Sequence, residues 1–282
     1  QLRKVILSKY WINHLFASAG FKPRRTPAVC GRVIIYNSKV SVKQEGNKNY
    51  EKNHSRMIPY ADTIKIKRPP WVNITLIVIN LAVFGYLLFL AQNPEALIRK
   101  YAFIPYRFFH ADWTFSLHHL MKYVNLIIPL ITSQFIHADY MHIIGNMLFL
   151  YVFGDNIEDR IGHFRYAVFY TLCGIIAMLV HGYVFKGSTL AVIGASGAIA
   201  GVLGAFYILY PSAKVKTFLL ITTKEFPAIT YLGIWFVFNL ARGILHIEGL
   251  YREPVAWWAH IGGFIAGALL INIFAINPPK SK

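Results

Sequence analysis

Long runs of apolar residues, separated by short polar or basic segments, dominate the chain from about residue 71 onward. Each run approaches the roughly 20 apolar residues that an α-helix needs to cross the hydrocarbon core of a membrane. The pattern therefore predicts an all-α polytopic membrane protein with a bundle of six transmembrane helices. The expected spans are about 71–92, 138–156, 164–185, 190–211, 226–246 and 255–276.

Composition agrees with a membrane protein, because 56% of the residues are hydrophobic and only 15% are charged. A soluble domain carries about 25% charged residues. The long segment between the first two spans, about 93–137, mixes aromatic and basic side chains. Such amphipathic composition suits the boundary between lipid and water, so we expect this first loop to lie in the membrane interface.

The net charge of +17 is concentrated before the first span, where about half of the 29 lysines and arginines lie. Nucleic-acid binding would explain such a basic tract, but enrichment of Lys and Arg on the cytoplasmic flanks of membrane proteins explains it more simply. The loops that would share this side are basic as well. We therefore expect both termini in the cytoplasm, the lipid bilayer as the surroundings and no nucleic-acid partner.

Residues 1–56 are basic and contain no acidic residue before Glu45. We expect a poorly ordered N-terminal extension over 1–56, with Met57 as a functional start site for a membrane domain over 57–282. An Arg-rich, acid-poor leader also suits import into an organelle. The sequence leaves these readings of the extension open.

Ser196 lies among glycines and alanines inside the expected fourth span, and His260 lies near the start of the sixth. Polar groups in spans are costly and indicate functional sites by default. Each residue alone is also explained by helix packing. However, the two spans run in the same direction, which places the two residues at similar depth. Both spans carry small residues four apart, which permit close approach of helix backbones: Gly197 and Gly201, Gly263 and Gly267.

His142 and Asn146 are four residues apart, so they share one face of the expected second span. Side chains of this kind can donate hydrogen bonds to the oxyanion that develops during amide hydrolysis. A metal site built from His137, His142 and His260 fits worse, because no His-Glu-x-x-His motif is present. A channel or transporter would be expected to show internal repeats or charged groups at mid-membrane, and the sequence shows neither.

The chain resembles the rhomboid intramembrane serine proteases over about residues 57–279. The resemblance rests on four segments that occur in the family's order: 137–146, 154–162, 194–197 and 259–263. It implies a membrane-embedded rhomboid protease domain over 57–282, with a six-helix bundle and an interfacial first loop. It implies no cofactor and no metal.

The resemblance also assigns roles within a catalytic dyad. Ser196 would be the nucleophile, and His260 the general base and then the general acid. His142, Asn146 and the backbone N–H of Ser196 would form the oxyanion hole, and Gly194 would let the substrate backbone approach. The substrates would be transmembrane proteins, cut in or near their membrane helices. The alternative is a catalytically inactive relative that binds transmembrane helices.

One departure from the family concerns His260. Many members carry an aromatic residue four after the serine, whereas this chain has Ala200. No Asp or Glu lies near either member of the dyad within a span, so helix packing is expected to orient the imidazole. The order of the motifs and the apparent start at Met57 favour a prokaryotic plasma membrane, with an organelle inner membrane as the alternative.

Overall fold

The computed structural model describes residues 57–113, 120–219, 222–249 and 255–276. Contacts divide the chain into a large unit, Ile58–Phe218 with Thr223–Lys282, and a small unit, Gln1–Met57 with Leu219–Thr222. The N-terminal extension expected over 1–56 lies outside the described residues. The helices that the structure describes, between Trp71 and Phe274, belong to the large unit.

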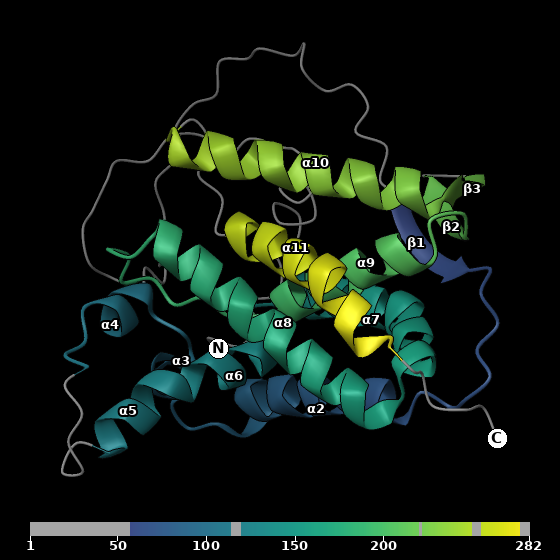
Figure 1. The fold of residues 1–282 in the computed structure, drawn as a ribbon. Helices are drawn as coiled ribbons and strands as arrows, with labels where there is room; N and C mark the ends of the chain where they lie inside the picture. Colours follow the sequence, from purple (N-terminus) through teal and green to yellow (C-terminus); the bar gives the residue numbers. More distant parts are fainter. Residues whose placement is uncertain (1–56, 114–119, 220–221, 250–254, 277–282) are drawn as a thin grey trace, which may run out of the picture. The chain divides into compact units, whose positions relative to one another are not determined.

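The large unit is mostly helical (Figure 1), which confirms the predicted fold class of a polytopic membrane helix bundle. Its long helices lie where the sequence shows apolar runs. They are α2 (Trp71–Gly85), which η1 (Tyr86–Leu90) continues, α7 (Tyr140–Ile161), α8 (His163–Val184), α9 (Ser196–Leu209), α10 (Ala228–Ile247) and α11 (Trp257–Phe274).

Within the described part of the chain, four helical segments are long and apolar enough to cross a membrane: Trp71–Leu90, α8, α10 and α11. The 14 residues of α9 span only about 21 Å at 1.5 Å per residue. Helix α7 is long enough, but its last two turns carry several charged residues. The number of six spans therefore stays a prediction.

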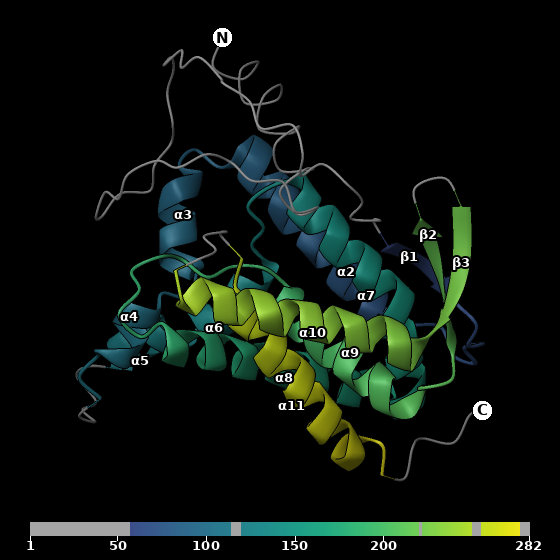
Figure 2. The ribbon, with the colours of Figure 1, turned by 90° about the horizontal axis from the view of Figure 1, so that it is seen from above.

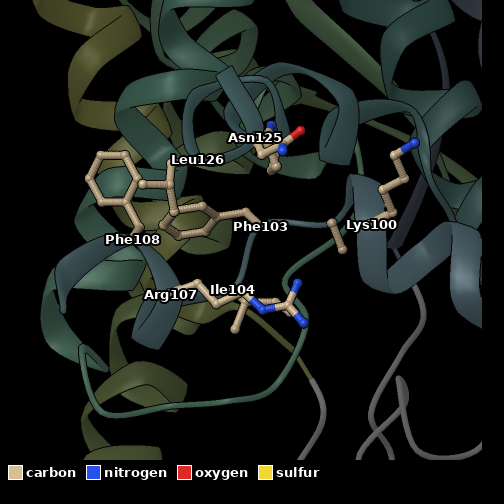
Figure 3. A pocket seen from close by; sticks show the side chains of 9 residues that line it. Lys100, Phe103, Ile104, Arg107, Phe108, Asn125 and Leu126 are labelled. Carbon is tan, nitrogen blue, oxygen red and sulfur yellow. The ribbon is translucent and has the colours of Figure 1, made fainter. Parts of the chain in front are cut away.

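The segment before α7 folds into short helices rather than an extended loop. The described elements are α3 (Pro94–Tyr101), α4 (Pro105–Phe109), α5 (Leu120–Ile127), α6 (Pro129–Thr132) and η3 (Ser133–Phe135). Helices α3, α4 and α6 begin with proline, whose fixed φ angle suits the first helical position. Lys100, Phe103, Arg107 and Asn125 help line a small pocket here (Figure 3), which none of the candidate site residues lines.

A small β-sheet was not expected from the sequence. Strands β1 (Met57–Asp62), β2 (Lys214–Leu219) and β3 (Thr222–Pro227) form one sheet in the order β1-β2-β3. The sequence around 214–227 reads as a polar loop, but Val215 and Thr217 alternate with more exposed neighbours. This period of two is the local signal of a strand.

Helix α9 is the central helix of the bundle, since α7, α8 and α11 all pack against it (Figures 1 and 2). Every residue from Gly197 to Phe206 is buried. Its contact with α11 is the tightest. A Cβ added at Gly263 or Gly267 would collide with the backbone carbonyl of Gly197 or Gly201, respectively. The close approach expected from these small residues is confirmed.

Helix α9 begins at Ser196, so the expected fourth span of 190–211 is wrong in its first six residues. The residues before Ser196 bond to the first loop instead of forming a helix. The backbone N–H of Val192 donates to the Phe103 carbonyl at 2.8 Å, and that of Gly194 donates to the Ser133 carbonyl at 2.9 Å. Gly194 has a φ of 116°, a conformation that favours glycine.

The start of α2 is capped by a carboxylate from α7. Pro70 precedes α2 and offers no side-chain cap, which leaves backbone N–H groups without acceptors. Glu158 accepts hydrogen bonds from the backbone N–H groups of Val72 at 2.9 Å and Asn73 at 2.7 Å. His163 contacts the same carboxylate. Since Glu158 is only 1% exposed, this charge joins α2 to α7 inside the protein.

Replacing Gly267 by alanine is expected to destabilise the bundle. The new methyl group would force α11 away from α9, and overpacking of this kind costs about 1–3 kcal/mol. Thermal unfolding in detergent should show a lower midpoint for Gly267→Ala. Gly85→Ala is the matched control, because no atom lies within 4 Å of the position of its Cβ. Equal midpoints for the two variants would contradict the close helix contact.

Replacing Glu158 by glutamine removes the charge that caps α2. Hydrogen bonds to a charged group contribute about 1.5–3 kcal/mol, so we expect Glu158→Gln to lower the free energy of unfolding by a similar amount. Glu225→Gln is the control, because Glu225 forms an exposed ion pair with Lys214 at 3.4 Å. Exposed pairs contribute little. Equal losses in the two variants, measured by unfolding in detergent, would disprove the capping role.

Candidate active site

Ser196 is the first residue of the central helix α9 and is half-buried. The first N–H groups of an α-helix have no acceptor within the helix, and here the first helical bond to a preceding residue is donated by Ile199, to Ala195. The hydroxyl of Ser196 therefore lies beside backbone N–H groups that have no acceptor among the described residues, at the positive end of the helix dipole.

His260 lies in the first turn of α11, and its ring contacts Ser196 directly. The distance between His260 Nε2 and Ser196 Oγ is 2.8 Å, which is a hydrogen bond. The side chains can meet because the glycines behind them let the two helix backbones touch. The structure therefore brings together the two residues that the sequence singled out on separate spans.

A third side chain completes this arrangement and was missed in the sequence. Asn239 of α10 places its Oδ1 atom 2.7 Å from His260 Nδ1. It is 3% exposed. The signal that could have found it is a polar residue within an apolar span, the same criterion that selected Asn146. Depth alone could not pair it with His260, because the rotation of α10 about its axis was not known.

His142 and Asn146 of α7 face the segment just before Ser196. A Cβ placed at Gly194 would lie 2.6 Å from His142 Nε2 and 3.8 Å from Asn146 Nδ2. All three residues therefore border one small region. Among the described residues, the buried Nδ2 group of Asn146 has no hydrogen-bond partner. An unpaired buried donor is costly, so this group is available to an acceptor that enters the site.

Histidine and carboxylate side chains do not gather into a metal site in the described part of the chain. His137 precedes α7 and packs against His142, with ring centroids 5.0 Å apart. Burial, and next the neighbouring His142, lowers the pKa of His137 to about 3. Its ring is therefore neutral at physiological pH.

The aromatic surroundings of His260 come from helices other than α9. The ring of Trp235 on α10 lies 5.9 Å from the His260 ring, and that of Trp257 lies 6.0 Å from it. Ala200, the position at which the sequence departs from the expected family pattern, is fully buried in the contact of α9 with α11. Side chains on α10 and α11 thus surround the imidazole.

The arrangement has the parts needed for acyl transfer. A hydroxyl lies within hydrogen-bonding distance of an imidazole, and the other ring nitrogen contacts an amide oxygen. Backbone and side-chain donors near the hydroxyl could stabilise a negative oxygen.

Comparisons with known proteins agree with this fold. Residues 125–277 match the Rhomboid domain family. The chain is 30% identical to Rhomboid protein 1, mitochondrial, of Saccharomyces cerevisiae over 229 residues, which cover 78% of this chain and 54% of the yeast protein. It is 28% identical to RHOMBOID-like protein 1 of Arabidopsis thaliana over 226 residues, which cover 74% and 54%.

A shorter match has higher identity. Rhomboid-like protein 11, chloroplastic, of Arabidopsis thaliana is 38% identical over 156 residues, which cover 54% of each protein. The chain spans about half the length of these three relatives. Because the family match covers more than half of the chain and includes α7 to α11, this integral membrane protein belongs to the rhomboid family.

Proposed function

We propose that the chain is an intramembrane serine endopeptidase that hydrolyses peptide bonds in or near the transmembrane helices of membrane proteins. The observation that carries the proposal is the 2.8 Å contact between Ser196 Oγ and His260 Nε2. In a rhomboid helix bundle, a serine activated by a histidine is suited to attack a peptide carbonyl. Ser196 is the proposed nucleophile and His260 the proposed general base.

The reaction would proceed in two halves. Ser196 Oγ attacks the peptide carbonyl carbon while His260 Nε2 takes the hydroxyl proton, which gives a tetrahedral oxyanion. The oxyanion collapses, the C–N bond breaks, and His260 gives the proton to the leaving amine. Water then attacks the acyl-enzyme with His260 again as the base. The ester bond breaks, and His260 returns the proton to Ser196.

His142 and Asn146 are the proposed donors to the oxyanion, together with the backbone N–H of Ser196. The free Nδ2 group of Asn146 and the position of Ser196 at the start of α9 support this assignment. The proximity of His142 to Gly194 supports a further role for the glycine. A side chain at 194 would fill the space through which a substrate backbone approaches, so Gly194 is proposed as a substrate-binding position.

The proposed protease domain covers 57–282. The proposed substrates are single-pass transmembrane proteins that enter from the lipid. No cofactor is required by this mechanism. The yeast relative is named as mitochondrial and one Arabidopsis relative as chloroplastic. These names support an organelle membrane over the prokaryotic plasma membrane that the sequence alone favoured.

Ser196→Ala and His260→Ala should each reduce cleavage of a model transmembrane substrate to background. The protein would be reconstituted in liposomes, and the cleavage products separated by gel electrophoresis. Ser212→Ala, at an exposed turn before β2, is the serine control and should cleave normally. A fluorophosphonate probe should label the wild type but not Ser196→Ala.

Two results would contradict the dyad. Normal cleavage by both variants would exclude Ser196 and His260 as reacting groups. Absence of labelling in a folded wild-type protein would favour the inactive relative that only binds transmembrane helices.

Asn146→Ala should lower kcat by about 10²–10³, the range seen when one oxyanion-hole donor is removed. The affinity for the substrate helix should change little. It is measured in protein that also carries Ser196→Ala and cannot cleave, with Ser196→Ala alone as the reference. Asn272→Ala, on the exposed face of α11, is the matched control. An unchanged kcat in Asn146→Ala would remove this residue from the proposed oxyanion hole.

A further inference from the structure

We propose that Asn239 is a positioning residue that fixes the tautomer and the orientation of His260. Ser196, His260 and Asn239 then form a chain of hydrogen bonds across α9, α11 and α10. This inference rests on the proposed function, because it assigns a role relative to the proposed base. It answers the question that the sequence left to helix packing, namely how the imidazole is held without a carboxylate.

The orientation of the Asn239 amide is set within its own helix. Its Nδ2 group donates a hydrogen bond to the backbone carbonyl of Trp235 at 2.7 Å. With the nitrogen engaged on α10, the oxygen of the amide points to α11 and lies 2.7 Å from His260 Nδ1. Since Asn239 is buried, water does not compete strongly for either bond.

This orientation determines which nitrogen of His260 carries the proton. An amide oxygen can only accept a hydrogen bond, so Nδ1 must be the donor. In a neutral imidazole with the proton on Nδ1, Nε2 presents a lone pair. That lone pair faces Ser196 Oγ at 2.8 Å and can accept the hydroxyl proton. The opposite tautomer would leave Nε2 with a hydrogen and no means of accepting that proton.

Neighbouring contacts keep α10 at the distance that this hydrogen bond needs. Gly243 lies one turn beyond Asn239 and therefore on the same face of α10. The Trp258 Nε1 group of α11 donates to the Gly243 carbonyl at 3.3 Å. A Cβ at Gly243 would lie only 3.2 Å from a methyl carbon of Ile261, so the two helices already touch there.

Asn239 differs from a carboxylate in an important way. An aspartate at this position would bring a negative charge into a region that excludes water, where an incompletely paired charge is costly. The neutral amide still accepts from Nδ1–H and stabilises the imidazolium that forms when Ser196 attacks. We infer that this chain orients its base through an uncharged acceptor.

A purely structural role for Asn239 can be separated from the positioning role. Asn80 of α2 makes the same intrahelical bond, from its Nδ2 group to the carbonyl four residues earlier, at 2.8 Å. Asn80 is fully buried, and its Oδ1 atom has no hydrogen-bond partner within the described residues. Asn80→Leu therefore removes the helix bond alone, whereas Asn239→Leu removes the helix bond and the contact with His260.

The test compares Asn239→Leu, Asn239→Asp and Asn80→Leu in the full chain, reconstituted with a model transmembrane substrate. Asn239→Leu should lower kcat about 10- to 100-fold, the equivalent of one hydrogen bond to a charged group, with KM unchanged. Asn239→Asp keeps an acceptor oxygen for Nδ1 and should restore most of the lost kcat, while its buried charge should lower the free energy of unfolding. Asn80→Leu should keep the wild-type kcat, and unfolding in detergent checks that each variant is folded.

A second readout does not depend on activity. In protein labelled with ¹⁵N-histidine, the NMR signal of His260, assigned by its absence in His260→Ala, should show the proton on Nδ1. A wild-type proton on Nε2 would overturn the proposal, as would wild-type kcat in Asn239→Leu. If Asn239→Leu fails to fold, the wild-type tautomer and the Asn239→Asp kinetics decide. Full activity of Ser196→Ala would instead reject the proposed function and leave the tautomer measurement valid.

Discussion

The backbone contact between α9 and α11 fixes the separation on which the rest of the site depends. Lipid tails are as apolar as the side chains they surround, so helix association in a membrane relies on close packing rather than on a hydrophobic driving force. Gly197 and Gly201 provide the packing surface on α9, and Gly263 and Gly267 provide it on α11. Larger residues at Gly263 or Gly267 would push α11 away from α9, and the side chains of Ser196 and His260 would be separated with them.

Several polar groups inside this bundle bond to partners on other elements. Glu158 of α7 accepts hydrogen bonds from backbone N–H groups at the start of α2. Tyr166 of α8 donates to Asn73 of α2, at 2.8 Å. Asn239 of α10 accepts from His260 of α11. Because water is scarce in such surroundings, each of these bonds specifies which helices are neighbours as well as stabilising them.

The sequence predicted those parts of the structure that follow from local patterns. Apolar runs placed the long helices, and the paired glycines predicted the contact of α9 with α11. Ser196 and His260 could be paired because their depth follows from position along a span. The start of α9 could not be predicted, since the residues before Ser196 are apolar but bond to the first loop.

Asn239 shows a second limit of sequence reasoning. The sequence shows how far along α10 this residue lies. Its contact with His260 also depends on how α10 is rotated and tilted, which only tertiary packing determines. Strands β2 and β3 were missed because short alternating segments resemble polar loops.

The hydrogen bond of Asn239 has a mechanical consequence. His260 is held on one side by a residue of α10 and on the other by a residue of α9, so its ring senses the position of both helices. Helix α10 is the less buried of the two along its length. On the role proposed for Asn239, a displacement of α10 away from α11 would remove the acceptor of Nδ1, whereas the contact with Ser196 involves only α9 and α11. The orientation of the imidazole would then depend on the position of α10, a helix to which the proposed nucleophile does not belong.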